Sequence, residues 1–364
     1  MVEEQSASLS AQLTQRIDAA ISVHGGWLPF DRFMAMALYE PGLGYYANHS
    51  RKFGTMPVSG SDFVTAPEMS ILFGRALAVQ VAQALRACGS GEIWEFGAGS
   101  GALAAQLLAE LGDQVASYHL IELSATLRER QALRLRPWAG RVHWHERLPE
   151  RLDGVMLGNE VLDAMPVQLL HWDGQRWFER GVARADAGFA WLDRPTRLRP
   201  PAGDFVSGTV LEIHPQAEAF IRTLAQRMGR AAAFFIDYGF PEAEYYHPQR
   251  SGGTLMCHRA HQADTDPLVD IGLKDITSHV NYSGIALAAQ DAGAQVLGYS
   301  SQARFLINCG LPALMVDAAL PERIAAQRLI HEHEMGELFK VLGLARGIEL
   351  DPLGFASGDR SHRL

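Results

Sequence analysis

A glycine-rich loop constrains the fold of this chain more than any other feature. The loop is the run EFGAGSG at residues 95–101. Residues 92–96 predict a short strand before it, and residues 102–111 predict a helix after it. Alternating glycines let the backbone turn sharply and keep Cβ atoms away from a bound molecule. The pattern therefore predicts a strand, a tight loop, and a helix whose first N–H groups face a ligand.

The residues after the loop repeat the alternation of strand and helix. We expect strands at 118–121, 142–144 and 154–157, and a helix at 124–135 with Ser124 as its N-cap. This order is typical of a parallel sheet with crossover helices. The sequence therefore predicts an α/β fold with a doubly wound, mostly parallel sheet.

The flanking regions follow other patterns. Apolar residues at helical spacing predict N-terminal helices, and Asp173-Gly174 between aromatic-rich runs predicts an antiparallel hairpin. Helices are expected at 8–24, after Pro29, and at 68–87, 215–228, 283–292 and 322–332, and strands at 231–236 and 338–344. The expected organisation is an N-terminal helical and loop region at 1–90 that packs over the ligand site, a core at 91–346 with an antiparallel insertion at about 167–210, and a tail at 347–364.

Two ligand classes fit the glycine loop. Gly97, Gly99 and Ala102 satisfy the dinucleotide pattern Gly-x-Gly-x-x-Gly/Ala. The other ligand is S-adenosylmethionine, which Glu95 favours because a carboxylate suits an ammonium and a sulfonium group and opposes a pyrophosphate. Glu122 ends the next strand about 20 residues past the glycines, where a carboxylate accepts ribose hydroxyls of either ligand.

Composition excludes several classes of protein. Of 364 residues, 48% are hydrophobic and 20% charged, which predicts a globular chain with a sizeable core. No unbroken apolar run is longer than the seven residues 33–39, and the run 231–236 has six, so no membrane span is expected. The net charge of −9 disfavours duplex nucleic acid. The three cysteines are far apart in the sequence, and the first residues have neither a basic nor an apolar leader. We therefore expect reduced thiols and a cytoplasmic location.

Six motifs in register resemble the MidA family of class I methyltransferases. They are SDFVTAPE (61–68), EFGAGSG (95–101), GNEVLDAMPV (158–167), IDYGF (236–240), GTL (253–255) with HRAH (258–261), and DITSHV (275–280). The resemblance covers about residues 29–345. One departure is Ala98, where the family commonly has proline.

The resemblance implies a Rossmann-like fold and S-adenosylmethionine as the cofactor. The mitochondrial members of the family are protein arginine methyltransferases that assist assembly of respiratory complex I, so it also implies a protein substrate bearing arginine. The expected cofactor-binding residues are Asp62, Thr65, Glu95, Gly97, Gly99, Gly101, Glu122 and Asn159. Asp62 and Thr65 belong to a loop that would close over the cofactor, although a simple turn is an equal alternative.

Three acidic residues are the expected catalytic groups. If a helix begins after the strand at 154–157, Glu160 and Asp163 share one face of it. Such a pair could hold a guanidinium group and concentrate charge on one nitrogen. The alternative is that Asn159 and Asp163 only cap that helix. Asp237 ends another buried strand, where it could orient substrate or cap the following turn.

Other interpretations stay open in the sequence. A dinucleotide-dependent oxidoreductase and a non-catalytic assembly factor are the alternatives to a methyltransferase. Apolar helix 68–87 could form a homodimer contact, but is more typical of a core. The histidines, chiefly His258, His261 and His279 and the pair His331 and His333, do not match a zinc motif, so no metal is expected.

Overall fold

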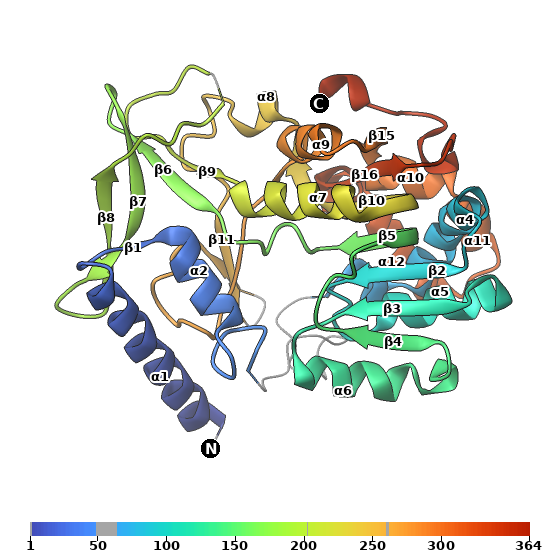
Figure 1. The fold of residues 1–364 in the computed structure, drawn as a ribbon, viewed down its shortest axis with the longest axis horizontal. Coiled ribbons are helices and arrows are strands. Elements are labelled where there is room, and N and C mark those ends of the chain that lie inside the picture. Colours follow the sequence, from blue (N-terminus) through green and yellow to red (C-terminus); the bar gives the residue numbers. More distant parts are fainter. Residues whose placement is uncertain (1, 49–63, 202, 260–261) are drawn as a thin grey trace. The chain divides into compact units, whose positions relative to one another are not determined.

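The computed structural model describes residues 2–48, 64–201, 203–259 and 262–364 (Figure 1). The chain divides into two compact units, each built from three separate segments. Unit 1 comprises residues 1–52, 163–217 and 242–281, and unit 2 comprises residues 53–162, 218–241 and 282–364. The predicted division at residue 90 stays a prediction.

Unit 2 contains the main sheet, in the strand order β15-β16-β10-β5-β2-β3-β4. The pairs β10·β5, β5·β2, β2·β3 and β3·β4 are parallel, and β16 is antiparallel to both β10 and β15. The strands are β2 (Glu92–Phe96), β3 (Ser117–Ile121), β4 (Val142–His145), β5 (Leu152–Asn159), β10 (Met228–Phe240), β15 (Gln295–Ser301) and β16 (Phe339–Arg346). The predicted mostly parallel α/β sheet is confirmed. The sequence analysis missed β15.

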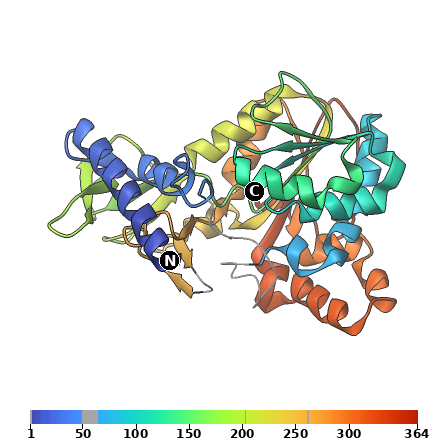
Figure 2. The same cartoon turned by 90° about the horizontal axis from the view of Figure 1, so that it is seen from below.

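Helices pack on this sheet and on one another. They are α3 (Ala66–Met69), α4 (Ile71–Cys88), α5 (Ala102–Leu111), α6 (Ala125–Arg134), α7 (Pro215–Arg227), α9 (Tyr282–Asp291), α10 (Gln302–Asn308), α11 (Leu311–Val316) and α12 (Leu320–Ile330). Short 3₁₀ segments lie at Gly112–Gln114, Arg136–Trp138, Leu353–Phe355 and Ser361–Arg363, and a π-helical turn at Glu332–Gly336. Helix α4 contacts α10, α11 and α12 (Figure 2).

The sheet is apolar on both faces, as a parallel sheet covered by helices requires. On β10, Ala232, Phe234 and Ile236 belong to the hydrophobic core that also contains α4 and α5. Because side chains alternate along a strand, Phe235 points to the other face. There its ring centroid lies 6.2 Å from that of Phe220 of α7. The continuous apolar run of β10 is therefore explained by burial on both faces.

Helix α4 is the one described helix that is long and apolar enough to cross a membrane. Most of it is buried inside the protein, where Leu72, Phe73 and Leu77 have no exposed surface. A core helix meets the same criterion of length and composition.

Unit 1 contains the antiparallel insertion. Its larger sheet consists of β1 (Leu28–Pro29), β6 (Gln168–Trp172), β7 (Trp177–Arg184), β8 (Phe189–Pro195) and β9 (Val210–Ile213), all paired antiparallel. A smaller sheet consists of β11 (Met256–Arg259), β12 (Gln262–Asp264) and β13 (Asp275–Thr277), and α8 (Glu242–Tyr245) and β14 (Val280–Asn281) complete the unit. Helices α1 (Val2–Val23) and α2 (Phe30–Tyr39) pack on the larger sheet, with Phe30 and Trp191 ring centroids 5.4 Å apart. The predicted hairpin is confirmed.

Candidate cofactor and active site

The glycine loop joins β2 to α5 at the carboxyl edge of the sheet. Gly97, Gly99 and Gly101 have φ of 62°, 51° and 79°, a left-handed conformation that side chains disfavour. A Cβ atom on Gly97 would lie 2.8 Å from Cγ2 of Val161, closer than carbon atoms approach. The loop therefore presents backbone atoms without side chains next to the first turn of α5. Such a surface suits the predicted cofactor.

Glu95 lies on β2 just before this loop and is 3% exposed. Tyr118 of β3 donates a hydrogen bond of 2.6 Å to its Oε2 atom. Burial raises the pKa of Glu95 to about 7, and the Tyr118 hydrogen bond acts in the opposite direction. The carboxyl group is thus held against the neighbouring strand, and it changes its charge near neutral pH.

Glu122 follows β3 directly and is 8% exposed. Its Oε1 atom accepts a hydrogen bond of 2.8 Å from the Ser124 backbone N–H, and its Oε2 atom accepts one of 3.1 Å from Gln131. Burial raises the pKa of Glu122, while these two hydrogen bonds lower it. The strand end therefore presents an oriented carboxylate, as ribose recognition requires.

The sequence analysis did not identify Gln131. This residue of α6 is 0% exposed and also donates a hydrogen bond of 2.9 Å to the Gly99 carbonyl. The spacing along the helix could have indicated its burial. Gln131 lies four residues after Leu127, so both lie on the same, buried face of α6. A glutamine on a buried helix face needs internal partners.

A second contact to the loop comes from α3. Ser100 donates a hydrogen bond to Oε1 of Glu68, and Arg134 donates to the same oxygen at 2.7 Å and to the Ser100 hydroxyl at 2.6 Å. The Glu68 side chain is largely buried. The short helix after residue 65 is thereby tied to the glycine loop and to α6.

Asn159 and Glu160 follow the central strand β5. Asn159 is its last residue, and its Nδ2 atom donates a hydrogen bond of 3.1 Å to Oε1 of Glu160. Among the described residues, the buried Oδ1 atom of Asn159 has no hydrogen-bond partner. An unpaired buried acceptor at this edge suits a donor such as the cofactor ammonium group. Glu160 has φ of 53°, which is rare for a residue other than glycine and is enriched at functional sites.

Asp237 explains this conformation. Its Oδ2 atom accepts hydrogen bonds from the backbone N–H groups of Val161 at 3.1 Å and Leu162 at 2.9 Å, and Oδ1 accepts from Tyr238 at 2.9 Å. The structure therefore does not meet the condition that a helix begins after this strand, because the Asp237 carboxylate binds these amides in an irregular turn. Asp237 is 1% exposed and supports the Glu160 turn, whereas direct contact with substrate stays a prediction.

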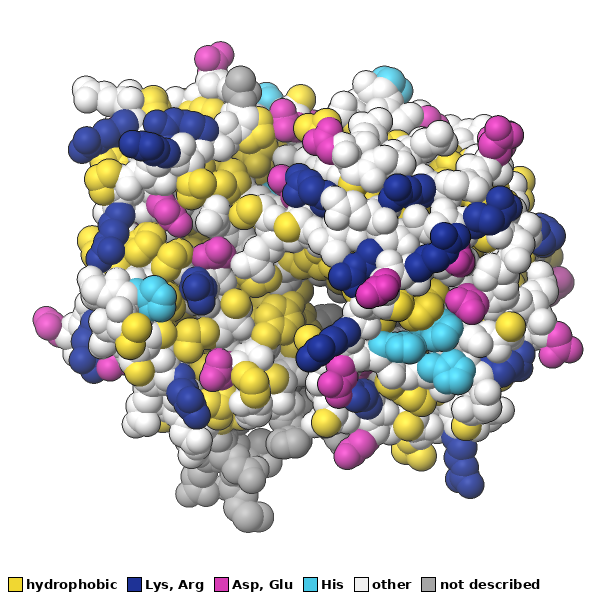
Figure 3. Space-filling model, in the orientation of Figure 1, with side chains coloured by type: hydrophobic (Ala, Val, Ile, Leu, Met, Phe, Trp, Pro, Cys, Tyr) yellow, Lys and Arg dark blue, Asp and Glu magenta, His cyan; other side chains and the backbone are white. Residues whose placement is uncertain are grey.

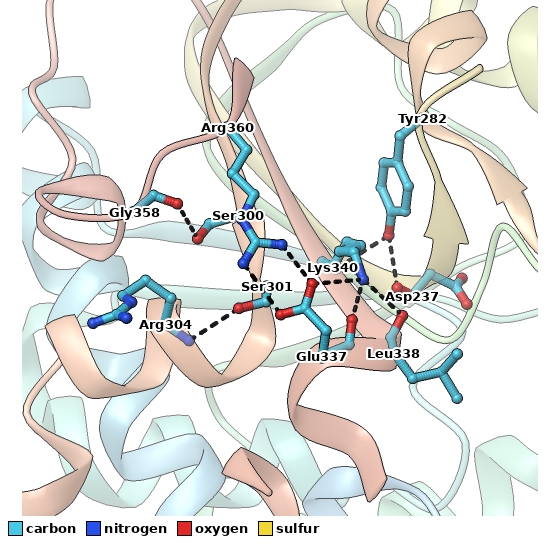
Figure 4. A network of polar contacts seen from close by, with 10 residues as sticks. All are labelled: Asp237, Tyr282, Ser300, Ser301, Arg304, Glu337, Leu338, Lys340, Gly358 and Arg360. Atoms are coloured by element: carbon cyan, nitrogen blue, oxygen red, sulfur yellow. Dashed lines mark hydrogen bonds and ion pairs between the residues drawn. The ribbon is translucent and has the colours of Figure 1, made fainter. Parts of the chain in front are cut away.

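A polar network continues behind Asp237 (Figure 4). Tyr282 donates hydrogen bonds to the carbonyl oxygens of Asp237 at 2.9 Å and Lys340 at 3.1 Å. The buried Lys340 ammonium lies 3.7 Å from Oε1 of Glu337, which also pairs with Arg360. The C-terminal tail is thus fixed to the strands that carry the site.

Asp163, Thr65 and Asp62 are the remaining predicted residues. Asp163 belongs to unit 1, where it is buried, its carbonyl accepts a hydrogen bond of 3.0 Å from Ser278, and its charge helps to raise the pKa of Tyr46. Thr65 is the N-cap residue of α3, but its side chain makes no capping hydrogen bond. Asp62 lies outside the described residues.

Histidine side chains gather on one face of the protein (Figure 3). In unit 2, the ring centroid of His119 lies 5.3 Å from that of His143 and 5.1 Å from that of His145. Nevertheless, in the part of the chain that the structure describes, no group of three or more histidine, cysteine or acidic side chains is arranged to hold a metal. His258 is described and His261 is not, so the absence of a metal stays a prediction.

Comparison with known proteins shows which enzyme family this chain belongs to. A family model for S-adenosyl-L-methionine-dependent methyltransferases matches residues 76–300. The chain belongs to this family. The match confirms the predicted S-adenosylmethionine cofactor and the methyltransferase class against the dinucleotide alternative.

Solved structures agree with this assignment. A protein from Burkholderia thailandensis whose structure contains bound S-adenosyl-homocysteine is 48% identical, and the match covers 99% of this chain and 98% of that chain with a TM-score of 0.95. A native structure from the same organism is 47% identical with the same coverage and a TM-score of 0.92. The Rossmann-like class I methyltransferase fold is confirmed.

Curated relatives are more distant in sequence. The protein arginine methyltransferase NDUFAF7 homolog of Drosophila melanogaster is 27% identical and covers 95% of this chain and 86% of its own length. The corresponding protein of Danio rerio is 27% identical and covers 94% and 89%. Both are mitochondrial proteins, so the predicted cytoplasmic location was wrong. That prediction rested partly on reduced cysteines, and the three cysteines are indeed buried free thiols, but a thiol's redox state does not define one compartment.

Proposed function

We propose that this methyltransferase modifies an arginine side chain of a protein partner, with Glu160 as the residue that holds the guanidinium group. The left-handed backbone of Glu160 carries the proposal, because such strain persists only where the surrounding structure enforces it. The names of the mitochondrial relatives support arginine as the acceptor. The net charge of −9 favours a basic partner.

The cofactor would lie along the glycine loop of unit 2. Gly97, Gly99 and Gly101 leave the backbone open to the cofactor. Glu122 would accept hydrogen bonds from the ribose hydroxyls, and Asn159 would accept one from the ammonium group. Glu95 lies on the strand just before the loop, where its ionised form adds negative charge. S-adenosylmethionine supplies an electrophilic methyl group on a sulfonium.

The chemistry at the acceptor depends on orientation. Arginine keeps its charge at neutral pH, so its nitrogens are poor nucleophiles. A carboxylate that accepts N–H groups concentrates the positive charge near itself and orients another nitrogen for attack. That nitrogen forms a bond to the methyl carbon as the carbon–sulfur bond breaks, and the proton it loses passes to Glu160 or to water. Asn159 fixes one oxygen of this carboxylate.

Glu160→Gln tests the proposal. The amide keeps the size of the side chain but loses its charge, so we expect methylarginine formation to fall at least about 100-fold. S-adenosylhomocysteine affinity should stay within about twofold of wild type. Methylation is measured with labelled S-adenosylmethionine and arginine-bearing peptides or lysate, followed by hydrolysis and identification of the labelled amino acid.

The matched control is Glu150→Gln, which removes the same charge from an exposed position. Undiminished methylation by Glu160→Gln would remove Glu160 from the mechanism. Label on a residue other than arginine would refute the acceptor assignment, and tight cofactor binding without any methylation would favour a non-catalytic assembly factor. A homodimer stays a prediction, which sedimentation equilibrium tests.

A further inference from the structure

One buried side chain joins the two parts of the cofactor site. The amide of Gln131 contacts the glycine loop, the Glu122 carboxylate and Trp144 of β4. We propose that Gln131 is a positioning residue for S-adenosylmethionine, which sets the orientation of the ribose-binding carboxylate relative to the glycine loop. This inference rests on the assignment of Glu122 to the ribose.

The hydrogen bonds leave the Gln131 amide one orientation. Its Oε1 atom lies 2.9 Å from Nε1 of Trp144. Because an indole nitrogen can only donate, this amide atom must be the oxygen. The Nε2 atom therefore points the other way, and its two hydrogens go to the Gly99 carbonyl at 2.9 Å and to Oε2 of Glu122 at 3.1 Å.

The two partners of Nε2 come from different strand ends. Gly99 belongs to the loop after β2, and Glu122 follows the neighbouring strand β3. A nucleoside on this edge has to contact both. A single rigid donor between them keeps the carbonyl and the carboxylate at a fixed separation before the cofactor binds, which lowers the ordering cost of binding.

Packing supports the same role. A Cβ atom on Gly101 would lie 3.5 Å from Cγ of Gln131, so the stem of the glutamine lies directly against the loop. The N-terminus of α6 is fixed as well, because Ser124 accepts a hydrogen bond of 3.4 Å from the Leu127 backbone N–H. The donor is thus held by a capped helix.

The hydrogen bond from Gln131 also affects the charge of Glu122. Burial raises the pKa of this carboxyl group, and the bonds from Ser124 and Gln131, the Leu123 backbone and the positive charge of Arg128 lower it. From β4, the His145 carbonyl accepts the Glu122 backbone N–H at 3.0 Å. Removing the Gln131 donor should therefore raise the pKa, so that Glu122 becomes neutral at a higher pH.

Gln131→Met is the decisive variant, because methionine has a similar length but no hydrogen-bonding amide. Calorimetric titration with S-adenosylhomocysteine should show affinity about tenfold weaker at pH 7, because the carboxylate and the loop are no longer held in position before the cofactor binds. As the pH is lowered, the affinity of the variant should begin to fall at a higher pH than that of wild type.

A matched control separates this effect from a general loss of stability. Gln80→Met removes another fully buried helical glutamine of unit 2, whose Oε1 atom accepts the Gly354 backbone N–H at 2.8 Å. It should destabilise the protein without changing affinity or pH profile. Equal weakening in both variants, wild-type affinity in Gln131→Met, or an unshifted pH profile would each overturn the proposal.

Glu122→Gln tests the underlying assignment separately. If it binds S-adenosylhomocysteine as wild type does, the ribose assignment fails and the role of Gln131 fails with it. If Glu122→Gln weakens binding while Gln131→Met does not, only the positioning role is refuted. Neither result bears on whether the acceptor is arginine.

Discussion

Replacing Glu160 with glycine and with alanine should separate backbone strain from chemistry. Both variants lose the carboxylate and its hydrogen bond from Asn159, so these losses cancel in the comparison. The alanine variant keeps a side chain at φ of 53°, a conformation that costs roughly 1–2 kcal/mol for a residue with a Cβ atom. Glycine removes this cost. However, glycine also makes the unfolded chain more flexible, which lowers the free energy of unfolding by about 0.5–1 kcal/mol relative to alanine.

The difference between these two effects makes Glu160→Gly more stable than Glu160→Ala by about 0–1.5 kcal/mol. The middle of this range corresponds to roughly 1.5–3 °C in melting temperature for a unit of this size. Differential scanning calorimetry measures this difference. Both variants should have lost methylation and kept S-adenosylhomocysteine binding. A glycine variant that melts below the alanine variant would show that the turn is not strained, and the inference from strain to function would fail.

Two further predictions concern the glycine loop and the response to acid. Gly97→Ala should weaken S-adenosylhomocysteine binding at least about tenfold in calorimetry. The added Cβ atom would lie 2.8 Å from Val161, and the backbone at this position is left-handed. Unchanged affinity would refute the inference that the loop must lack side chains to bind the cofactor. Burial lowers the pKa of His214 to about 4 from 6.5, so this ring is neutral in the folded state. The unfolded chain takes up the proton as pH falls below 6.5, so the free energy of unfolding should drop by about 3 kcal/mol between pH 6.5 and 4 and then level off. In urea titrations His214→Gln should flatten this dependence, and an equally steep fall would assign it to other groups.

Local pattern was sufficient for the framework of the site. The sequence predicted the strand Glu92–Phe96 and the helix Ala102–Leu111 with the bounds observed, because glycines end one and begin the other. The strand Gln295–Ser301 was missed, since its polar and small residues do not produce a strong apolar pattern.

Long-range contacts were beyond the sequence. The turn at Glu160 depends on a carboxylate that lies more than 70 residues later in the chain, and no local pattern could show that Asp237 would bind these amides. Similarly, Gln131 resembled an ordinary helical residue until its three partners were visible. What could be predicted was the order of the strands, while β5 and β10 extend past their expected ends to Asn159 and Phe240. Which side chains orient one another at these ends required the tertiary structure.

The interleaving of the two units has a consequence for biosynthesis. The chain passes from one unit to the other at residues 52/53, 162/163, 217/218, 241/242 and 281/282. On the ribosome, helices α1 and α2 must therefore wait more than 100 residues for the strands β6–β8 on which they pack, and the main sheet lacks β16 until the chain is nearly finished. Folding cannot proceed one unit after the other from the N-terminus, as it does in proteins with contiguous domains. Nascent chains would therefore expose the apolar surfaces of both units for most of translation.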